Sequence, residues 1–186
     1  YLSYLQTNGR GRNSNQWKSM RGNLFLSTIF RPKISKVNWH QLSLVISLSI
    51  IETLITLGLD KSKIELKWPN DVLVHKSKIS GVLLESFDDF IVAGIGLNVL
   101  KKPQIEIKWK TTKLHDHINK DFSLKYIANV ILKTIYKNYA IWEDKGLIFF
   151  KKKINDSMHN IKNKIVIKLN SQSNYINGIF LGIGDN

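Results

Sequence analysis

Hydrophobic and polar positions follow two different periods along this chain, and together they predict both strands and helices. Residues 1–5 and 23–30 are rich in apolar, aromatic and β-branched side chains, which favours strands. Residues 6–22, which lie between them, are mostly polar and contain three glycines. This stretch is too long for a hairpin turn, and loops of such length are usually functional or mobile. We therefore expect a functional loop between the first two strands.

A helical period follows the second strand. Apolar residues recur three and four positions apart from Leu44 to Ile55, which predicts a well-buried helix. Asn38, followed three residues later by Gln41, resembles a capping box at the start of this helix. Gly58 is a suitable stop, because glycine readily adopts the conformation that ends a helix.

Four short apolar segments then predict further strands, at residues 64–68, 72–75, 78–85 and 90–93. A second helix should begin at Ser123, because Ile127, Ile131 and Ile135 fall four residues apart and share one face. A third, shorter helix is expected over residues 144–153. This order of elements predicts an α+β fold, in which a mixed sheet carries helices packed on one face.

The C-terminal residues change in character. Residues 164–169 and 175–181 are predicted strands separated by a polar stretch. We place a main domain at residues 1–159 and a small β unit at residues 160–186. So few residues cannot bury much core alone, so this unit should pack on the main domain or be incomplete. Because the chain opens with Tyr1 inside a predicted strand, we also expect a segment upstream of it.

The composition adds a strong positive charge and removes cysteine chemistry. With 28 basic and 14 acidic residues the formal net charge is +14, which would attract nucleotides, acidic proteins or nucleic acid. Heavy use of lysine alone explains the same charge equally well. The lack of cysteine excludes disulfides and a cysteine nucleophile, and fits a cytoplasmic protein. The most apolar run, residues 42–59, contains Glu52 and several hydroxyls, so we expect a core helix and no membrane partner.

Residues 9–12, Gly-Arg-Gly-Arg, form the strongest local signal. The glycines allow main-chain amides to approach an anion closely, and the arginines carry planar charged groups that suit carboxylate and phosphate. The same tetrapeptide also occurs in disordered segments that bind nucleic acid. Here it lies between two predicted strands, so we interpret it as an anion-binding loop.

A second signal is residues 67–71, Lys-Trp-Pro-Asn-Asp, directly after a predicted strand. Asn70 and Asp71 offer oxygen ligands and Lys67 offers a cation within one turn. Oxygen ligands of this kind suit Mg²⁺ that shares the phosphates of a nucleotide. A plain turn with solvated side chains explains the pentapeptide equally well.

Glycine lies inside one predicted strand and directly after another. Lys78 begins an otherwise apolar strand that contains Gly81, and glycine inside a strand often marks the close approach of a ligand. A solvated lysine at the end of a strand is the simpler alternative. Gly94 and Gly96, followed by Asn98, again leave room for a ligand, but without a following helix they are not a dinucleotide fingerprint.

Each motif alone is ambiguous, but their order along the chain closely resembles the biotin–protein ligase family. The resemblance runs from residues 6–12 through 67–71 and 78–81 to 94–98, and covers nearly the whole chain. It implies a class II synthetase-like catalytic domain whose N-terminal part is missing, followed by part of a small SH3-like β-barrel. Where the family usually has a second basic cluster, residues 13–15 are Asn-Ser-Asn, so this loop carries less charge.

The resemblance also implies a role for each matching residue. Lys78 and Arg12 are the implied catalytic residues, with Lys78 beside the biotin carboxylate and the α-phosphate of ATP. The loop that binds biotin and adenylate, and orders around them, matches Gln6, Gly9, Arg10, Gly11 and Arg12, and the pocket wall matches Gly81, Gly94 and Gly96. The implied nucleotide-binding residues are Asn23, Lys67, Asn70, Asn98 and Trp109, with Asp71 and Asn23 at the Mg²⁺ ion.

The implied activity is that of an ATP-dependent biotin–[acetyl-CoA-carboxylase] ligase. Biotin would be activated to biotinyl-5′-AMP and passed to a lysine of the biotin carboxyl carrier domain of acetyl-CoA carboxylase, with ATP and Mg²⁺ required. A homodimer is a further expectation. DNA is an expected partner if the full-length protein has an upstream DNA-binding domain.

Two alternatives remain at this point. A lipoate–protein ligase shares the expected fold and reaction type, although residues 9–12 and 67–71 favour biotin. A basic nucleic-acid-binding module would explain the charge and the Gly-Arg loop. It would not explain why residues 67–71 occur together with Lys78.

Overall fold

The computed structural model describes residues 1–103, 110–169 and 174–184. In these residues six strands form one sheet in the order β1-β2-β6-β5-β4-β3, and every neighbouring pair is antiparallel. The strands are β1 (Leu2–Ser3), β2 (Leu24–Phe30), β3 (Ile64–Lys67), β4 (Asp71–Val74), β5 (Ser77–Phe87) and β6 (Phe90–Leu97). The predicted combination of a sheet with helices is confirmed. The prediction of a mixed sheet is wrong, because tight turns join β3 to β6 in succession and reverse the chain each time.

The two faces of the sheet have different side chains, as the register of β5 and β6 shows. Val82 lies opposite Ile95, and both belong to the hydrophobic core. One residue earlier along β5, Gly81 lies opposite Gly96. Because successive residues of a strand point to opposite faces, the glycines mark the face that the core does not use.

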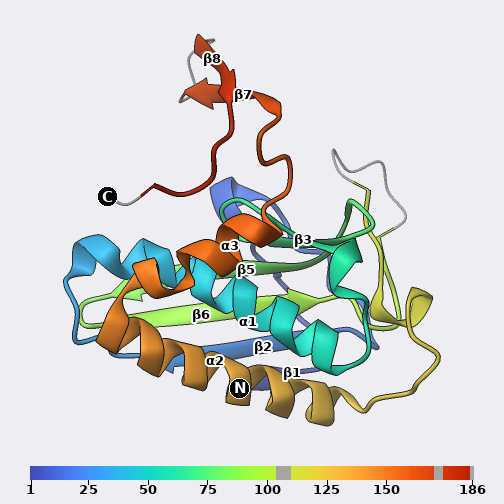
Figure 1. The fold of residues 1–186 in the computed structure, drawn as a ribbon. Coiled ribbons are helices and arrows are strands. Elements are labelled where there is room, and N and C mark those ends of the chain that lie inside the picture. The colour runs from blue at the N-terminus through green and yellow to red at the C-terminus, as the bar shows by residue number, and fades with distance from the viewer. Residues whose placement is uncertain (104–109, 170–173, 185–186) are drawn as a thin grey trace.

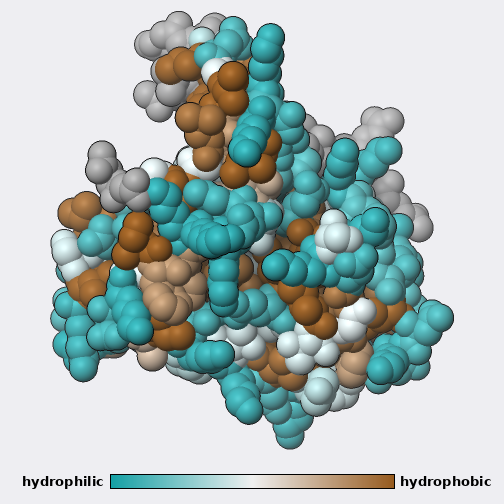
Figure 2. Space-filling view, in the orientation of Figure 1, coloured by the Kyte–Doolittle hydropathy of each residue, from teal (hydrophilic) through white to brown (hydrophobic). Residues whose placement is uncertain are grey.

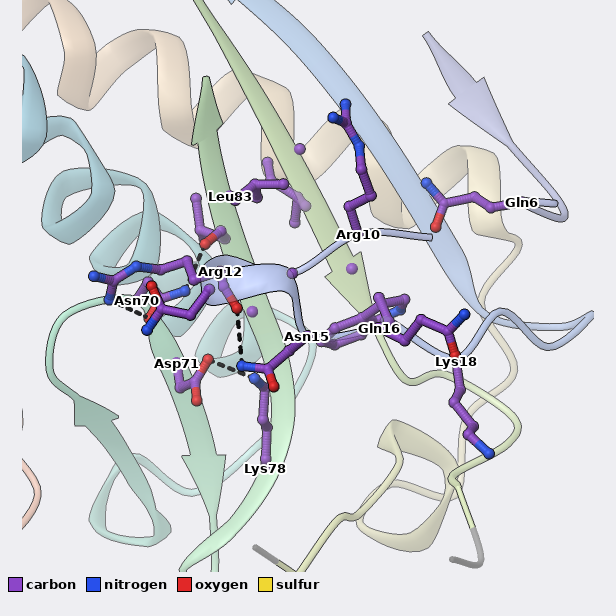
Figure 3. Close-up of a pocket in the computed structure, with 18 of the residues that line it drawn as sticks. Gln6, Arg10, Arg12, Asn15, Gln16, Lys18, Asn70, Asp71, Lys78 and Leu83 are labelled. Carbon is purple, nitrogen blue, oxygen red and sulfur yellow. Dashed lines mark hydrogen bonds and ion pairs between the residues drawn. The ribbon is translucent and has the colours of Figure 1, made fainter. Parts of the chain in front are cut away.

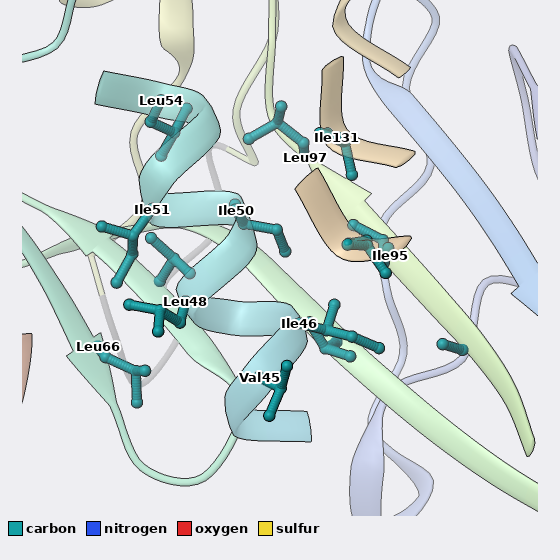
Figure 4. Close-up of a cluster of buried hydrophobic side chains, with 14 of the residues drawn as sticks. Val45, Ile46, Leu48, Ile50, Ile51, Leu54, Leu66, Ile95, Leu97 and Ile131 are labelled. Atoms are coloured by element: carbon teal, nitrogen blue, oxygen red, sulfur yellow. The ribbon is translucent and has the colours of Figure 1, made fainter. Parts of the chain in front are cut away.

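Two helices cover the core face of the sheet (Figure 1). Helix α1 (Leu42–Thr56) lies against β3, β4 and β5, and α2 (Leu124–Lys145) packs beside α1 and against β2. Figure 4 shows Ile46 and Ile50 of α1 among Ile95 and Ile131, all of them buried. The prediction that helices pack on one face is therefore confirmed.

Helix α1 is a core helix. Together with the preceding 3₁₀ turn it gives a segment, Lys36–Thr56, that is long and apolar enough to cross a membrane by length and composition alone. However, 72% of its most apolar part is buried inside the fold. A core helix meets the length and composition criteria in the same way, so the segment is explained by packing against the sheet.

The ends of the helices agree with the sequence in part. The hydroxyl of Ser123 accepts a hydrogen bond from the backbone N–H of Tyr126 at 3.1 Å, which confirms the predicted start of α2. The predicted capping box is wrong, because Asn38 and Gln41 lie in a 3₁₀ turn and bond to each other through their side chains. The predicted third helix is shifted toward the C-terminus, to α3 (Lys151–Ser157).

The C-terminal strands form a hairpin that projects from the main body (Figure 1). Strand β7 (Lys164–Leu169) pairs antiparallel with β8 (Asn174–Ile179). Asn155 of α3 exchanges two hydrogen bonds with the backbone of Ile183 and ties the segment after the hairpin to the body. Figure 2 shows apolar residues exposed on this hairpin, above a mostly hydrophilic body. Two strands agree with a small β unit but do not by themselves make a barrel.

Candidate functional site

A cavity of about 700 Å³ lies on the glycine face of the sheet, opposite the helices. Its lining includes the loop between β1 and β2, the turn between β3 and β4, and the glycine-containing strands β5 and β6. Its volume is within the usual range for small-molecule sites, about 300–1,000 Å³. The segments that carried the sequence motifs therefore meet at one place (Figure 3).

Glycines of β5 and β6 make a flat floor for the cavity. Gly81 pairs with Gly96, and Gly94 pairs with Leu83 of β5 and with Ser27 of β2. A Cβ atom added at Gly96 would overlap the indole ring of Trp17, which lies directly on the backbone there. The backbone at Gly81 and Gly96 is ordinary strand, so glycine is needed here for space and not for conformation.

At one end of this floor Lys78 and Asp71 form an ion pair. The Lys78 Nζ lies 2.6 Å from the Asp71 Oδ1, and the two side chains are 26% and 15% exposed. Asp71 begins β4 opposite Gly81 of the neighbouring β5, which brings the carboxylate to the same face as the floor. Lys78 is held from its other side by Lys110 and Thr112, which bond to its backbone. The simpler alternative of a fully solvated lysine at a strand end is therefore wrong.

Arg12 lies above this ion pair, as Figure 3 shows. Its Nη1 donates a hydrogen bond of 3.4 Å to the Oδ1 of Asn70. Asn70 is itself fixed to β5, because its Nδ2 donates to the Val82 carbonyl at 2.7 Å and its carbonyl accepts from the Val82 N–H at 3.0 Å. The turn after β3 is therefore rigidly attached to the sheet, while Arg12 is attached to it by one long hydrogen bond.

The loop that carries Arg12 folds back on itself as a small hairpin. The Trp17 N–H donates to the Gly9 carbonyl at 3.0 Å, and Arg10 bridges Gln16 in antiparallel register. Arg10 also forms an ion pair of 2.9 Å with Glu85 of β5. Both arginines of the Gly-Arg-Gly-Arg segment thus contact the far wall of the cavity, one at each end.

Asn23 lies behind the cavity, next to Asn98 at its lining, and both residues are almost fully buried. The Asn23 Oδ1 accepts hydrogen bonds of 3.0 Å from the backbone N–H groups of Val99 and Lys101, and its Nδ2 donates to Asn98 and to the Lys101 carbonyl. Asn23 does not line the cavity. Asn23 thus holds the segment after β6 in place through its side-chain oxygen. Its predicted contact with the nucleotide and Mg²⁺ stays a prediction.

The sequence profile of the biotin/lipoate A/B protein ligase family matches residues 3–99, which is more than half of the chain. The chain belongs to this family. A solved structure, the biotin protein ligase from Aquifex aeolicus in complex with biotin and ATP, is similar over 99% of this chain and 77% of that one, with 34% identity and a TM-score of 0.87. The fold of the chain is therefore that of a biotin protein ligase.

Two curated relatives are similar at the level of sequence. The biotin–[acetyl-CoA-carboxylase] ligase of Mycobacterium tuberculosis is 37% identical over 114 residues, which are 60% of this chain and 42% of that protein. The bifunctional ligase/repressor BirA of Salmonella typhimurium is 38% identical over 162 residues, 78% of this chain and 47% of that protein. The chain spans less than half the length of either relative.

The other residues predicted from the family resemblance mostly lie at the cavity. Gln6, Arg10, Gly11, Lys67, Gly81, Gly94, Gly96 and Asn98 all line it. Gly9 lies at the base of the loop, where a Cβ atom would overlap the Trp17 carbonyl. Trp109, predicted to pack near adenine, lies outside the described residues.

The oxygen atoms near Lys78 fit the Mg²⁺ ion that the family resemblance implies. Asp71 offers a carboxylate and Asn70 an amide oxygen, on neighbouring residues that line the cavity. In the part of the chain that the structure describes, no group of three or more His, Asp or Glu residues could enclose a metal ion. This donor set suits an ion that is bound largely by water and phosphate, as Mg²⁺ usually is.

Glu85 and Trp17 are among the cavity residues to which the sequence assigned no role. The alternation of side chains along β5 could have indicated Glu85, because it lies two and four residues beyond Leu83 and Gly81 on the same face. For Trp17, nothing in the sequence showed that its ring lies on the floor of the cavity.

Proposed function

We propose that this chain activates biotin with ATP and transfers it to a lysine of a carrier protein. The observation that carries this proposal is the arrangement at the cavity floor, where a flat glycine surface leads directly to the Lys78–Asp71 pair beneath Arg12. Such a cavity offers one end for an uncharged ring and another for a carboxylate and phosphates. The biotin ligases among its relatives, and a related structure that contains biotin and ATP, support this assignment.

In the first half-reaction a carboxylate oxygen of biotin forms a bond to the α-phosphorus of ATP, and the bond to pyrophosphate breaks. Both reactants are anions, so positive charge must offset their repulsion. Lys78 and Arg12 supply this charge at one end of the floor. The remaining contribution is orientation, which holds carboxylate and phosphorus in line and can be worth up to about 7–11 kcal/mol.

Asp71 and Asn70 would hold Mg²⁺ together with the phosphates, and the ion would neutralise charge on the leaving pyrophosphate. While the ion pair is intact, the Asp71 carboxylate is shared with Lys78. Lys67, the last residue of β3, also lines the cavity and adds a further cation at the phosphate end.

In the second half-reaction the amine of a carrier lysine attacks the acyl carbon of biotinyl-adenylate, and AMP leaves. We propose the biotin carboxyl carrier domain of acetyl-CoA carboxylase as the acceptor, in keeping with the activity that names the Mycobacterium tuberculosis relative. The hairpin of residues 9–17 covers the cavity from the solvent side, and this position would keep water from the labile adenylate.

A lipoate–protein ligase is the alternative within the same family, since the family description names both acids. The flat floor favours biotin, because two facing glycines make room for a ring system lying on the backbone. A nucleic-acid-binding module is not favoured, because it gives no reason for a cavity with an ion pair at one end of its floor.

The test is a reconstitution with the purified chain, an acceptor carrier domain, ATP and Mg²⁺. Biotin and lipoate are supplied in separate reactions, and release of pyrophosphate and mass of the carrier are measured. Biotin-dependent pyrophosphate release with a matching mass increase on one carrier lysine is the expected result. Activation of lipoate but not of biotin would make this chain a lipoate–protein ligase. Activation of neither acid would refute the ligase assignment.

Several other expectations stay predictions. The β7–β8 hairpin is proposed as part of a small SH3-like unit after the catalytic domain, which agrees with its position beyond α3. Cytoplasmic location, a homodimer and a link to DNA through an upstream domain are proposals of the same kind. Analysis of the full-length reading frame and its oligomeric state would test them.

A further inference from the structure

Trp17 fills the part of the cavity where a ligand ring would lie. A Cβ atom at Gly81 would come within 3.1 Å of its Cζ3, and a Cβ atom at Gly96 would overlap its Cε2 and Cζ2. The indole thus spans the two facing glycines, in contact with the backbone of β5 and β6. The protein's own side chain therefore covers this floor.

The indole matches the floor in shape but not in polarity. Its Nε1 is enclosed, yet it has no hydrogen-bond partner among the residues that the structure describes. A buried N–H group without a partner destabilises the conformation that encloses it. The side chain is therefore held by ring contact alone, and a ring whose polar groups find partners at this floor would replace it favourably.

The same ring contacts the main cation of the site. The Lys78 Nζ lies 5.3 Å from the centroid of the Trp17 ring, within the range of a cation–π contact, and 2.6 Å from the Asp71 carboxylate. The ammonium is thus engaged on two sides while Trp17 is on the floor. Removal of the indole would take away one of these two contacts.

The segment that carries Trp17 is attached so that it can move as a unit. Its internal hydrogen bonds, such as Trp17 N–H to Gly9, stay within the hairpin. Its links to the opposite wall include the Arg10–Glu85 ion pair, in which Arg10 is well exposed, and the 3.4 Å hydrogen bond from Arg12 to Asn70. Exposed ion pairs contribute little free energy, so these contacts resist displacement of the hairpin weakly.

We propose that Trp17 is a built-in competitor for the ring of the substrate. In the ligand-free chain the indole closes the floor over Gly81 and Gly96, and the fused ring system of biotin enters by displacing it. Its departure also frees one side of Lys78, so that the cation becomes available as the carboxylate arrives. The identity of the displacing ring rests on the proposed function, whereas the covering of the floor does not.

The covering is tested without any ligand. The full chain is labelled with 5-fluorotryptophan, and the Trp17 signal in the ¹⁹F spectrum is assigned with Trp17→Phe. The expected Trp17 signal is protected from a soluble paramagnetic quencher. Gly96→Ala should expose it, because the new Cβ atom overlaps the ring, whereas Gly178→Ala, at a strand glycine with open space around it, should not. A Trp17 signal that is already exposed in the parent chain would overturn the proposal.

Displacement is tested by stopped-flow binding of biotin without nucleotide. If the floor is open about one-tenth of the time, Trp17→Ala should raise the association rate constant about tenfold, and Trp17→Phe should give a smaller increase. Equal rate constants for parent and Trp17→Ala would contradict competition. If biotin binds to neither protein, the proposed function fails, and the fluorine experiment still decides whether Trp17 covers the floor.

Discussion

The Lys78 ammonium lies 2.6 Å from the Asp71 carboxylate. The two residues belong to adjacent strands, and both line a cavity of about 700 Å³. A half-buried cation held in this way is placed before any substrate arrives. Preorganised charge of this kind stabilises a transition state without the cost of reorganisation at the moment of reaction.

Replacement of Lys78 by methionine should slow adenylate formation by roughly 10²–10³-fold, as expected for losing one preorganised charge-stabilising group. Methionine keeps most of the bulk of the stem, so folding should change little. Transfer from chemically supplied biotinyl-adenylate should suffer less, since it bypasses the step at phosphorus. The measurement compares single-turnover adenylation with transfer, and equal slowing of the two would indicate general damage to the cavity.

The variant Asp71→Asn should raise the Mg²⁺ concentration needed for half-maximal activity roughly 10- to 100-fold, the range typical of residues that support a metal ion. It keeps the size of the side chain beside Gly81 but removes the negative charge. Titration of activity with Mg²⁺ measures the effect. An unchanged Mg²⁺ dependence would show that Asp71 does not bind Mg²⁺ and serves only in its ion pair with Lys78.

The variant Arg12→Gly should release biotinyl-adenylate at least about tenfold faster, because a charge-assisted hydrogen bond is worth about 1.5–3 kcal/mol. Leaked adenylate would then label lysines of a bystander protein. Arg31→Gly is the matched control, since Arg31 pairs with Asp89 on the surface and does not line the cavity. If both variants retain adenylate as the parent does, Arg12 does not help to close the site.

Alanine at Gly94 should weaken biotin binding roughly tenfold or more without loss of stability. A Cβ atom there meets Leu83 at no less than 3.8 Å, so the strand accepts it, and alanine in a strand is favoured by about 0.5–1 kcal/mol. The added methyl takes space from the floor, which typically costs about 1–3 kcal/mol of binding. Calorimetric binding and thermal unfolding measure the two effects. Gly178→Ala should leave biotin binding unchanged. If Gly94→Ala also left biotin binding unchanged, the biotin ring would not lie against Gly94 of β6.

The stability of the protein should fall as the pH drops below about 6.5, in part through His117. Burial lowers the pKa of His117 below its ordinary value of 6.5, and the nearby His75 acts in the same direction. The neutral ring is therefore favoured in the fold, so its stabilising contribution is present above the unfolded pKa and is lost as the pH falls through the folded one. For one proton the slope stays below about 1.4 kcal/mol per pH unit.

Urea unfolding of the parent and of His117→Gln, at several pH values between 5 and 7.5, measures this contribution. The variant should show a shallower fall in the free energy of unfolding over this range. Parallel curves for the two proteins would show that His117 titrates alike in the folded and unfolded states.

The sequence predicted the elements of the core well, because their signals are local. The four-residue spacing of Ile127, Ile131 and Ile135 predicted α2, and the hydroxyl of Ser123 caps it. The ends of elements that depend on distant partners were less accurate. The first strand was predicted over residues 1–5 but covers Leu2–Ser3, since beyond that point the chain leaves the edge of the sheet.

The order of the motifs along the sequence determined the family, and with it the residues that line the cavity. What the sequence could not decide was which atoms already have partners. Asn23 and Asp71 both carry side-chain oxygens, yet the first is buried behind the site with both amide groups bonded, and the second faces the cavity. The position of Trp17 on the glycines of two other strands depends on contacts across more than 60 residues of chain, which local spacing does not encode. Local periodicity thus set the helices and strands, whereas the pairing of distant strands decided which side chains meet at the site.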